Sequence, residues 1–299
     1  GINIPVSVTT IGDYAFADMN ALTRLRTPSQ DMEFETYVFA YNHNLVNLKL
    51  TNKLIGEHMF DSCDNKNFTT LVIPKITHKV LYSISHNSPI ISIDEINGDI
   101  RPYAFANCTG LTTISFEIGD NDTNGANYLG KYMFANCTGI EELYVTDNIK
   151  YIDEAALYMA TSLHTLVLPF VGAEVGIEGT EESLFGWIFG YNASASSDLV
   201  EQVTQIRNID DHTFDVMTSI PKGLVNLTVT DETVVAYGAF SNIKTITNYV
   251  FDNIEVSNIN QINNQILEII GAYAFYNSGI TYLNSKSTGD TISVYNINI

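Results

Sequence analysis

One short acidic segment contains residues that could bind a metal ion. Asp120, Asp122, Asn124 and Gly125 reproduce the start of the calcium-loop pattern D-x-[DN]-x-[DN]-G, in which carboxylate and amide oxygens converge on a hard cation. The pattern then fails, because the twelfth position counted from Asp120 is Lys131 and not a bidentate glutamate. An Asn-, Asp- and Gly-rich turn explains the same letters. Asp120, Asp122 and Asn124 are therefore weak calcium candidates, and the sequence commits to no metal site.

Cysteine and histidine, which could bind a transition metal or act as catalytic groups, are few and scattered. The chain has 3 cysteines and 6 histidines. The cysteines lack the paired C-x-x-C spacing of a zinc site, and the histidines show no metal spacing either. No Ser-His-Asp order, phosphate-binding loop or paired-carboxylate cluster stands out. The sequence predicts a chain that is not an enzyme and that carries no cofactor.

Composition restricts the class of partner. Lys and Arg total 14 against 34 Asp and Glu, so the formal net charge is −20, and the hydrophobic fraction of 45% is enough for a large core. A field of this sign repels the phosphates of nucleic acids and of anionic membranes. No stretch approaches the roughly 20 apolar residues of a membrane helix. We therefore expect neither a nucleic-acid partner nor membrane insertion, and we expect a monomer.

A fixed internal period is the strongest signal in the chain. An apolar-x-x-apolar step, usually continued by x-apolar, recurs with starts 23, 23, 22, 21, 29, 23, 61, 19 and 37 residues apart. Such alternation is typical of a short strand. The steps are Leu22/Leu25, Leu45/Leu48/Leu50, Phe68/Leu71/Ile73, Ile90/Ile93, Leu111/Ile114/Phe116, Ile140/Leu143/Val145, Leu163/Leu166/Leu168, Leu224/Leu227/Val229, Ile243/Ile246 and Ile280/Leu283.

The second half of each unit is an Ala-Phe pair or its equivalent, about six residues before the next step, as in Ala15-Phe16 and Ala104-Phe105. Asn, Ser and Gly follow it, which favours a tight turn or a short helical piece. One such unit cannot bury its own apolar face, whereas stacked units can. The period therefore predicts a curved coil of about 10–11 stacked repeats of ~22–23 residues, each with a short strand and a tight turn or short helical piece.

We predict one solenoid domain over residues 1–299. The 61-residue gap between two successive steps indicates an insertion at about 172–221, and the 29-residue gap indicates a shorter one at about 118–128. The longer insertion contains the single tryptophan. Its aromatic residues could anchor a partner, since exposed loops on rigid scaffolds often carry recognition, or could form the insertion's own small core. These residues are Phe185, Trp187, Phe189 and Tyr191.

The cysteines share one position of the repeat. Cys63, Cys108 and Cys137 each lie three residues after the phenylalanine of their unit. This indicates a small inward-facing slot in which a thiol packs as a small apolar group. Equivalent positions on adjacent units also lie within disulfide reach, so a bond between Cys108 and Cys137 is the alternative.

The repeat resembles a known family. The units Y-A-F-A-N-C-T-G-L-T-T-I-S-F (103–116) and Y-M-F-A-N-C-T-G-I-E-E-L-Y-V (132–145) look like the BspA-type leucine-rich repeat, and the match extends over nearly the whole chain. Residues 168–172 and 185–190 also resemble an insertion that recurs in bacterial members. The resemblance implies an α/β leucine-rich-repeat solenoid, a curved right-handed coil with a concave parallel sheet and irregular turns or short helices on the convex side. It also implies display on host-associated bacteria or mucosal protists and adhesion to host or microbial proteins. It transfers no catalytic residue and no ligand-contact motif.

Candidate ligand-binding residues follow from strand geometry, because residues two and four positions after the first apolar residue of each step point away from the core. The step at Ile243 places Thr245 and Thr247 in these rows. The two rows together contain twenty positions, of which only five are charged. The positive residues Arg24, Arg26 and Lys49 and the negative residues Asp94 and Glu142 give these rows a net charge of +1. Thr and Val are also simply good exposed strand formers. The candidates are Arg24, Asn47, Thr70, Ser92, Thr113, Glu142, Tyr144, Thr165, Asn226 and Thr228.

Three functions compete for this sequence. The first is an extracellular adhesin module that binds a protein or glycoprotein on a host or a neighbouring microbe, and the second is a spacer that displays another domain from the cell surface. The third, an enzyme of the parallel β-helix kind acting on acidic polysaccharide, would have only Asp94 and Glu142 on the exposed face and no basic patch. The chain starts at Gly1 without an apolar leader, so we expect a secreted fragment whose leader and anchor lie outside it.

Overall fold

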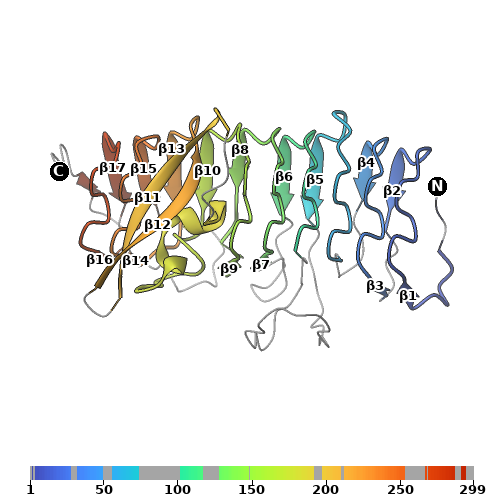
Figure 1. Cartoon of the computed structure of the whole chain (residues 1–299), viewed down its shortest axis with the longest axis horizontal. Coiled ribbons are helices and arrows are strands. Elements are labelled where there is room, and N and C mark those ends of the chain that lie inside the picture. The colour runs from blue at the N-terminus through green and yellow to red at the C-terminus, as the bar shows by residue number, and fades with distance from the viewer. Residues whose placement is uncertain are drawn as a thin grey trace.

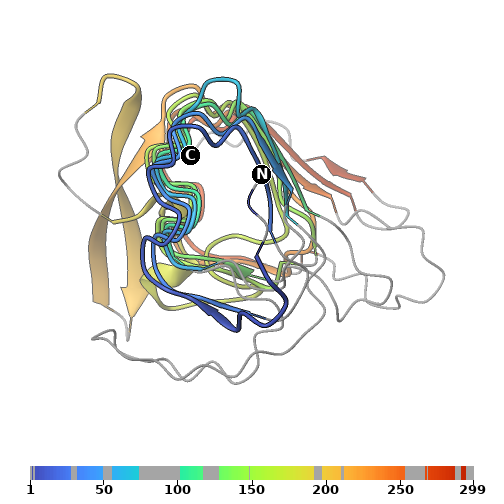
Figure 2. The same cartoon turned by 90° about the vertical axis from the view of Figure 1, so that its right-hand side faces the viewer.

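The structure is a computed structural model, in which units of the repeat stack along the long axis of the molecule (Figure 1). Seen along that axis, the backbone traces of successive units nearly superimpose and enclose one continuous core (Figure 2). The structure describes residues 2, 4–27, 32–49, 56–73, 102–116, 128–147, 149–191, 197–209, 212–252, 267, 269–286 and 291–293.

One strand of each described unit lies on the same side of the molecule, in three hydrogen-bonded parallel groups that follow one another along its length (Figure 1). Alternation explains these strands, since the apolar residues of the step, such as Leu25, Leu143 and Leu227, are buried while their neighbours face outward. Strand β4 contacts β5 and β6 contacts β8, which makes the paired groups continuous. The strands are β2 (Arg24–Arg26), β4 (Asn47–Lys49), β5 (Thr70–Ile73), β6 (Thr113–Phe116), β8 (Glu142–Tyr144), β10 (Thr165–Leu168), β13 (Asn226–Val229), β15 (Asn248–Asp252) and β17 (Tyr282–Lys286), and β18 (Thr291–Ser293) pairs antiparallel with β17.

Units of the repeat also turn back through second, shorter strands, six of which lie in the described residues. These strands precede the Ala-Phe segment and pair in parallel as β1 with β3, β7 with β9 and β14 with β16. Together they line a second side of the coil, away from the long sheet (Figure 2). They are β1 (Thr10–Ile11), β3 (Glu33–Phe34), β7 (Tyr128–Leu129), β9 (Tyr151–Ile152), β14 (Val234–Val235) and β16 (Ile269–Ile270).

The Ala-Phe segments form a third side, which we call the turn face (residues 14–18, 37–41, 58–62, 103–107, 132–136, 155–159, 238–242 and 273–277). Backbone hydrogen bonds join its units, as from the N–H of Phe60 to the carbonyl of Ala104 at 2.8 Å. Each segment contains two left-handed residues four positions apart, such as Tyr103 (φ 56°) and Asn107 (φ 57°). The turn predicted from Ala-Phe and its polar followers is thereby confirmed, and it is an inter-unit ladder rather than an isolated turn.

Two aromatic rows run along the turn face. The phenylalanines stack inside the core with centroids 5.4–5.9 Å apart over Phe16, Phe39, Phe60, Phe105 and Phe134. A second row lies outside it, with neighbouring centroids 4.2–4.8 Å apart and ring planes within 12° of parallel. The sequence analysis missed this outer row, although its ring always lies two residues before the phenylalanine. Its members are Tyr14, Tyr37, His58, Tyr103 and Tyr132.

The cysteine slot is confirmed, and the alternative of a disulfide is not adopted. Cys63, Cys108 and Cys137 are free and fully buried. Each thiol also donates a weak hydrogen bond to the phenylalanine carbonyl of the preceding unit, with the sulfur 3.1–3.4 Å from the oxygen. Asn42 fills the slot in its own unit and donates to Phe16 and Phe39 in the same manner. In these four units the side chain in the slot therefore bonds to the backbone as well as filling the space.

Burial makes these thiols chemically inert in the folded protein. It raises the pKa of Cys63 and of Cys137 to about 12 and that of Cys108 well above its usual value, so the reactive thiolate is suppressed. We expect DTNB at about pH 8 to leave the native protein unlabelled and to titrate all 3 cysteines after denaturation. Rapid labelling of any thiol under native conditions would contradict the burial of the cysteines in the slot.

Two parts of the predicted repeat pattern are wrong. β5 pairs directly with β6, with Thr70 opposite Thr113, although the sequence predicts one more unit between them, and the step at Ile90–Ile93 lies outside the described residues. Near the C-terminal end, the predicted step at Ile243 starts three residues early. Ile243 lies three residues after Phe240 and so occupies the cysteine slot, and Tyr249 lies opposite Leu227 in the sheet. The outward positions of β15 are therefore Asn248 and Val250, not Thr245 and Thr247.

The segment between β10 and β13 adds two 3-10 helices and a hairpin. These are η1 (Glu181–Ser183), η2 (Phe185–Phe189), β11 (Val200–Ile209) and the antiparallel β12 (His212–Pro221). On the sheet side β10 pairs directly with β13, whereas on the turn face η2 lies between the neighbouring units. It accepts a hydrogen bond from the N–H of Ala155 and donates one to the carbonyl of Ala239. The hairpin lies against the outside of the turn face (Figure 2).

The aromatic residues of this segment pack inward. Phe185, Trp187 and Phe189 are buried in the main core, and the indole N–H of Trp187 donates to the carbonyl of Ile152 at 2.7 Å. Tyr191 is half-buried and bonds through its hydroxyl to the carbonyl of Glu181. The interpretation as packing residues is confirmed, with the correction that they extend the solenoid core instead of forming a separate one.

Candidate functional site

The predicted ligand-binding residues form two rows on the outward side of the long sheet, which we call the sheet face. Backbone pairing aligns Arg24 with Asn47 and Thr70 with Thr113. Further along, Thr165 lies between Glu142 and Asn226, and the second row aligns Tyr144 with Val167 and Thr228. The described members are exposed or half-buried. Their outward placement is therefore observed, and their contact with a ligand stays a prediction.

Several predicted residues lie outside the described part of the chain. Ser92 and Asp94 are among them. The calcium candidates Asp120, Asp122 and Asn124 also lie outside it. Within the described ranges, no group of three or more His, Cys, Asp or Glu is placed to hold a metal ion.

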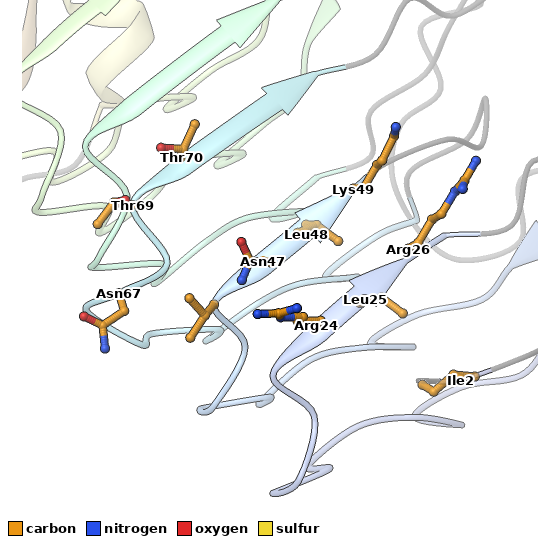
Figure 3. A pocket seen from close by; sticks show the side chains of 11 residues that line it. Ile2, Arg24, Leu25, Arg26, Asn47, Leu48, Lys49, Asn67, Thr69 and Thr70 are labelled. Atoms are coloured by element: carbon orange, nitrogen blue, oxygen red, sulfur yellow. The ribbon is translucent and has the colours of Figure 1, made fainter.

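A groove of ≈580 Å³ opens on the sheet face over β2, β4 and β5 (Figure 3). Its long polar side chains project from strand positions that alternate with inward-facing leucines. Ile2 and Val46 supply apolar surface at its border. The residues that line it are Ile2, Arg24, Leu25, Arg26, Val46, Asn47, Leu48, Lys49, Asn67, Thr69 and Thr70.

The groove is positively charged in a chain of net charge −20. Arg24, Arg26 and Lys49 are exposed, and no carboxylate of the described residues lies within the 4.0 Å of an ion pair with any of them. Arg26 and Lys49 are paired positions of neighbouring strands, and their side chains extend together away from the sheet (Figure 3). Three cations that have no ion-pair partner among the described residues can hold an external anion.

Several polar groups on the rest of the sheet face bond to one another. The hydroxyl of Tyr144 donates to Glu142 at 3.0 Å, and this bond to the carboxylate raises the pKa of Tyr144. Beyond them the amide of Asn248 donates to Asn226 at 2.8 Å, which in turn donates to Thr165 at 3.4 Å. The exposed cations of the described sheet face, by contrast, lie at the groove.

Sequence reasoning placed Arg26 and Lys49 in the outward rows but did not single them out. It summed the charge over the whole face to +1, which concealed the local concentration. The available signal was the Arg-x-Arg of one unit followed 23 residues later by Asn-x-Lys at the same two positions. Asn67 and Thr69 lie before a strand, so the rule that selects residues two and four positions after the first apolar residue of a step could not find them.

Stacked parallel strands, connecting turns and an uncovered polar sheet define the class of protein as a repeat solenoid. Six copies of the BspA type leucine rich repeat region match residues 1–86, 74–185 and 233–297, so the chain belongs to this family. Its fold is accordingly the leucine-rich-repeat type, with mostly parallel strands and few helices. Separately, no helix of the described residues is long and apolar enough to cross a bilayer.

Among solved structures, the chain is similar to a leucine-rich repeat protein from Bacteroides ovatus ATCC 8483, with a TM-score of 0.51 and 15% sequence identity. The alignment covers 94% of this chain and 53% of that protein, so the present chain spans about half the length of its structural neighbour. No curated protein matches the sequence. At this identity the likeness concerns the fold alone.

Proposed function

We propose that this chain is a non-catalytic binding module that recognises a protein or glycoprotein on a host or a neighbouring microbe through its sheet face. The observation that carries the proposal is the groove over β2, β4 and β5, where Arg24, Arg26 and Lys49 have no ion-pair partner among the described residues. Exposed cations without an internal partner suit a surface that meets its partner from outside.

The proposed function also includes an extracellular location. Family membership supports it, because proteins with BspA-type repeats are typically secreted or held at the cell surface. A rigid stack of units also suits a spacer that holds another domain away from the wall. A binding module and a spacer differ in one testable respect, because only the binding module must bind a ligand saturably.

The test is a binding screen with two double variants. The purified chain is titrated over immobilised matrix proteins, mucins and microbial surface proteins, and we expect saturable binding to at least one of them. Thr113→Trp with Thr228→Trp obstructs the sheet face at two exposed or half-buried strand positions. Thr213→Trp with Met217→Trp places the same bulk on exposed positions of the β12 hairpin. Tryptophan is compatible with strands, so both variants should fold.

We expect the sheet-face variant to lose affinity at least about 10-fold and the hairpin variant to bind as the parent does. Absence of saturable binding across the panel would favour the spacer and overturn the proposal. Loss of binding in the hairpin variant alone would move the contact surface away from the sheet face.

A further inference from the structure

We propose that the groove over β2, β4 and β5 binds an acidic polysaccharide, with Arg24, Arg26 and Lys49 holding its carboxylate or sulfate groups. The proposal rests on the proposed function and adds the class of ligand. The sequence analysis found no basic patch on the exposed face, and the structure corrects this by assembling three cations from two neighbouring strands around one hollow.

The backbone positions that carry the cations are closely spaced, which suits repeated anionic groups. Arg26 and Lys49 are paired positions of adjacent strands, which lie about 4.8 Å apart, and Arg24 is two residues along the same strand, about 6.6 Å from Arg26. The planar guanidinium matches carboxylate and sulfate oxygens in a bidentate manner, and the lysine ammonium adds a compact charge. One ligand can therefore meet two or three cations at once, which is more favourable than a single exposed ion pair.

Neutral polar groups surround the cations. Asn47, Asn67, Thr69 and Thr70 line the same groove and supply amide and hydroxyl groups that can both donate and accept hydrogen bonds. Sugar hydroxyls require such two-way partners, whereas a cation can only donate. The first row, from Arg24 through Asn47 to Thr70, crosses the strands and so follows the long axis, which provides a track for an extended chain.

The lining disfavours other macromolecular anions. It contains no aromatic side chain, whereas protein partners are usually anchored by Trp or Tyr, and single-stranded nucleic acids stack their bases on aromatic rings. It also contains no Asp or Glu, so it lacks the carboxylate pair with which glycosidases cleave sugars. Glu142 lies on β8, beyond β5 and β6 in the sheet. The groove therefore suits the binding of an acidic glycan and not its hydrolysis.

The net charge of −20 makes the expected salt dependence unusual. At an ionic strength of 0.01 M the screening length is about 30 Å, so the distant carboxylates repel a polyanion. At 0.15 M it falls to about 8 Å, which screens that repulsion but leaves contacts within the groove. At still higher salt these contacts weaken as well. Affinity should therefore pass through a maximum at intermediate ionic strength, whereas non-specific attraction of a polyanion falls steadily with salt.

The test measures binding of defined oligomers by calorimetry. The probes are a sulfated glycosaminoglycan octasaccharide, an octamer of galacturonate, a neutral glucan octamer and an octaglutamate peptide. Arg26→Gln with Lys49→Gln removes two groove cations while keeping polar side chains. Lys150→Gln with Lys222→Gln is the charge-matched control, because both lysines are exposed and lie outside the groove. The parent is measured at 0.01, 0.15 and 0.5 M salt.

We expect one or both acidic octasaccharides to bind, the groove variant to weaken binding about 20-fold and the control to change it less than about 3-fold. The sulfated and the uronate probe distinguish which anionic group is preferred. Equal binding of the neutral glucan, or stronger binding of the octaglutamate, would overturn the proposal. So would an equal loss in both variants or an affinity that falls steadily with salt. Failure here together with saturable binding in the screen above would overturn only the ligand class, whereas failure of both would overturn the binding function.

Discussion

Replacing Phe105 with alanine is expected to lower the free energy of unfolding by about 4 kcal/mol, the cost typical of removing a buried phenylalanine. The ring is fully buried and stacks between Phe60 at 5.4 Å and Phe134 at 5.9 Å. Because a unit in a solenoid contacts only its neighbours, the cavity interrupts the buried aromatic stack that joins the two flanking units. Urea denaturation followed by circular dichroism measures the loss.

Phe16→Ala is the matched control for this prediction. Phe16 is only half-buried and stacks on one neighbour, Phe39, at 5.4 Å, because it belongs to an outer unit of the row. We expect it to cost about half as much as Phe105→Ala. Equal losses for the two variants, or a loss at Phe105 below about 1 kcal/mol, would show that the row does not connect the units as described.

Gly238→Ala is expected to cost about 3 kcal/mol and to release the β11–β12 hairpin from the turn face. Gly238 has a φ of 67° and occupies the position that carries a tyrosine of the outer row in other units. A Cβ added there would lie 1.7 Å from the carbonyl oxygen of Ile206 in β11. The penalty combines left-handed strain of about 1–2 kcal/mol with overpacking of about 1–3 kcal/mol. Limited proteolysis within residues 200–221 and the urea midpoint measure both effects.

The control for the backbone strain is Gly179→Ala. Gly179 also has a left-handed φ, of 74°, but nothing lies within 4 Å of a Cβ at that position. Its substitution should cost only the strain, about 1 kcal/mol, and should leave the hairpin protected from protease. If Gly238→Ala matched this control in stability and in protease resistance, the hairpin would not be seated on the turn face.

The sequence by itself determined the features that depend on neighbours one unit away. The steps at Leu22, Leu45 and Phe68 predicted strands, and the structure contains β2, β4 and β5 there. The position of Cys63, Cys108 and Cys137 three residues after a phenylalanine predicted their burial. Such features are local, because strand period and stacking depend only on side-chain order within a unit and its repeat.

Which units are in contact follows from the folded chain and not from the order of its residues. Ile243 and Ile246 fit the apolar step by their letters, yet the stack assigns Ile243 to the cysteine slot, since Tyr249 must pair opposite Leu227. Likewise β5 pairs directly with β6, and η2 takes the place of an Ala-Phe segment on the turn face. Because insertions vary in length, counting residues along the chain does not identify which unit packs against which. The neighbour of each unit is therefore set by packing.

One part of the candidate site could be predicted from the sequence, and another part depends on the folded structure. The row rule found the outward positions of Arg24, Asn47 and Thr70, because alternation along a strand fixes which side a residue faces. It could not find the groove, since the concentration of charge depends on the pairing of Arg26 with Lys49 across two strands and on the loop residues beside them. A net charge of −20 is a property of the composition, whereas a positive hollow within it arises only when separate units are brought together in space.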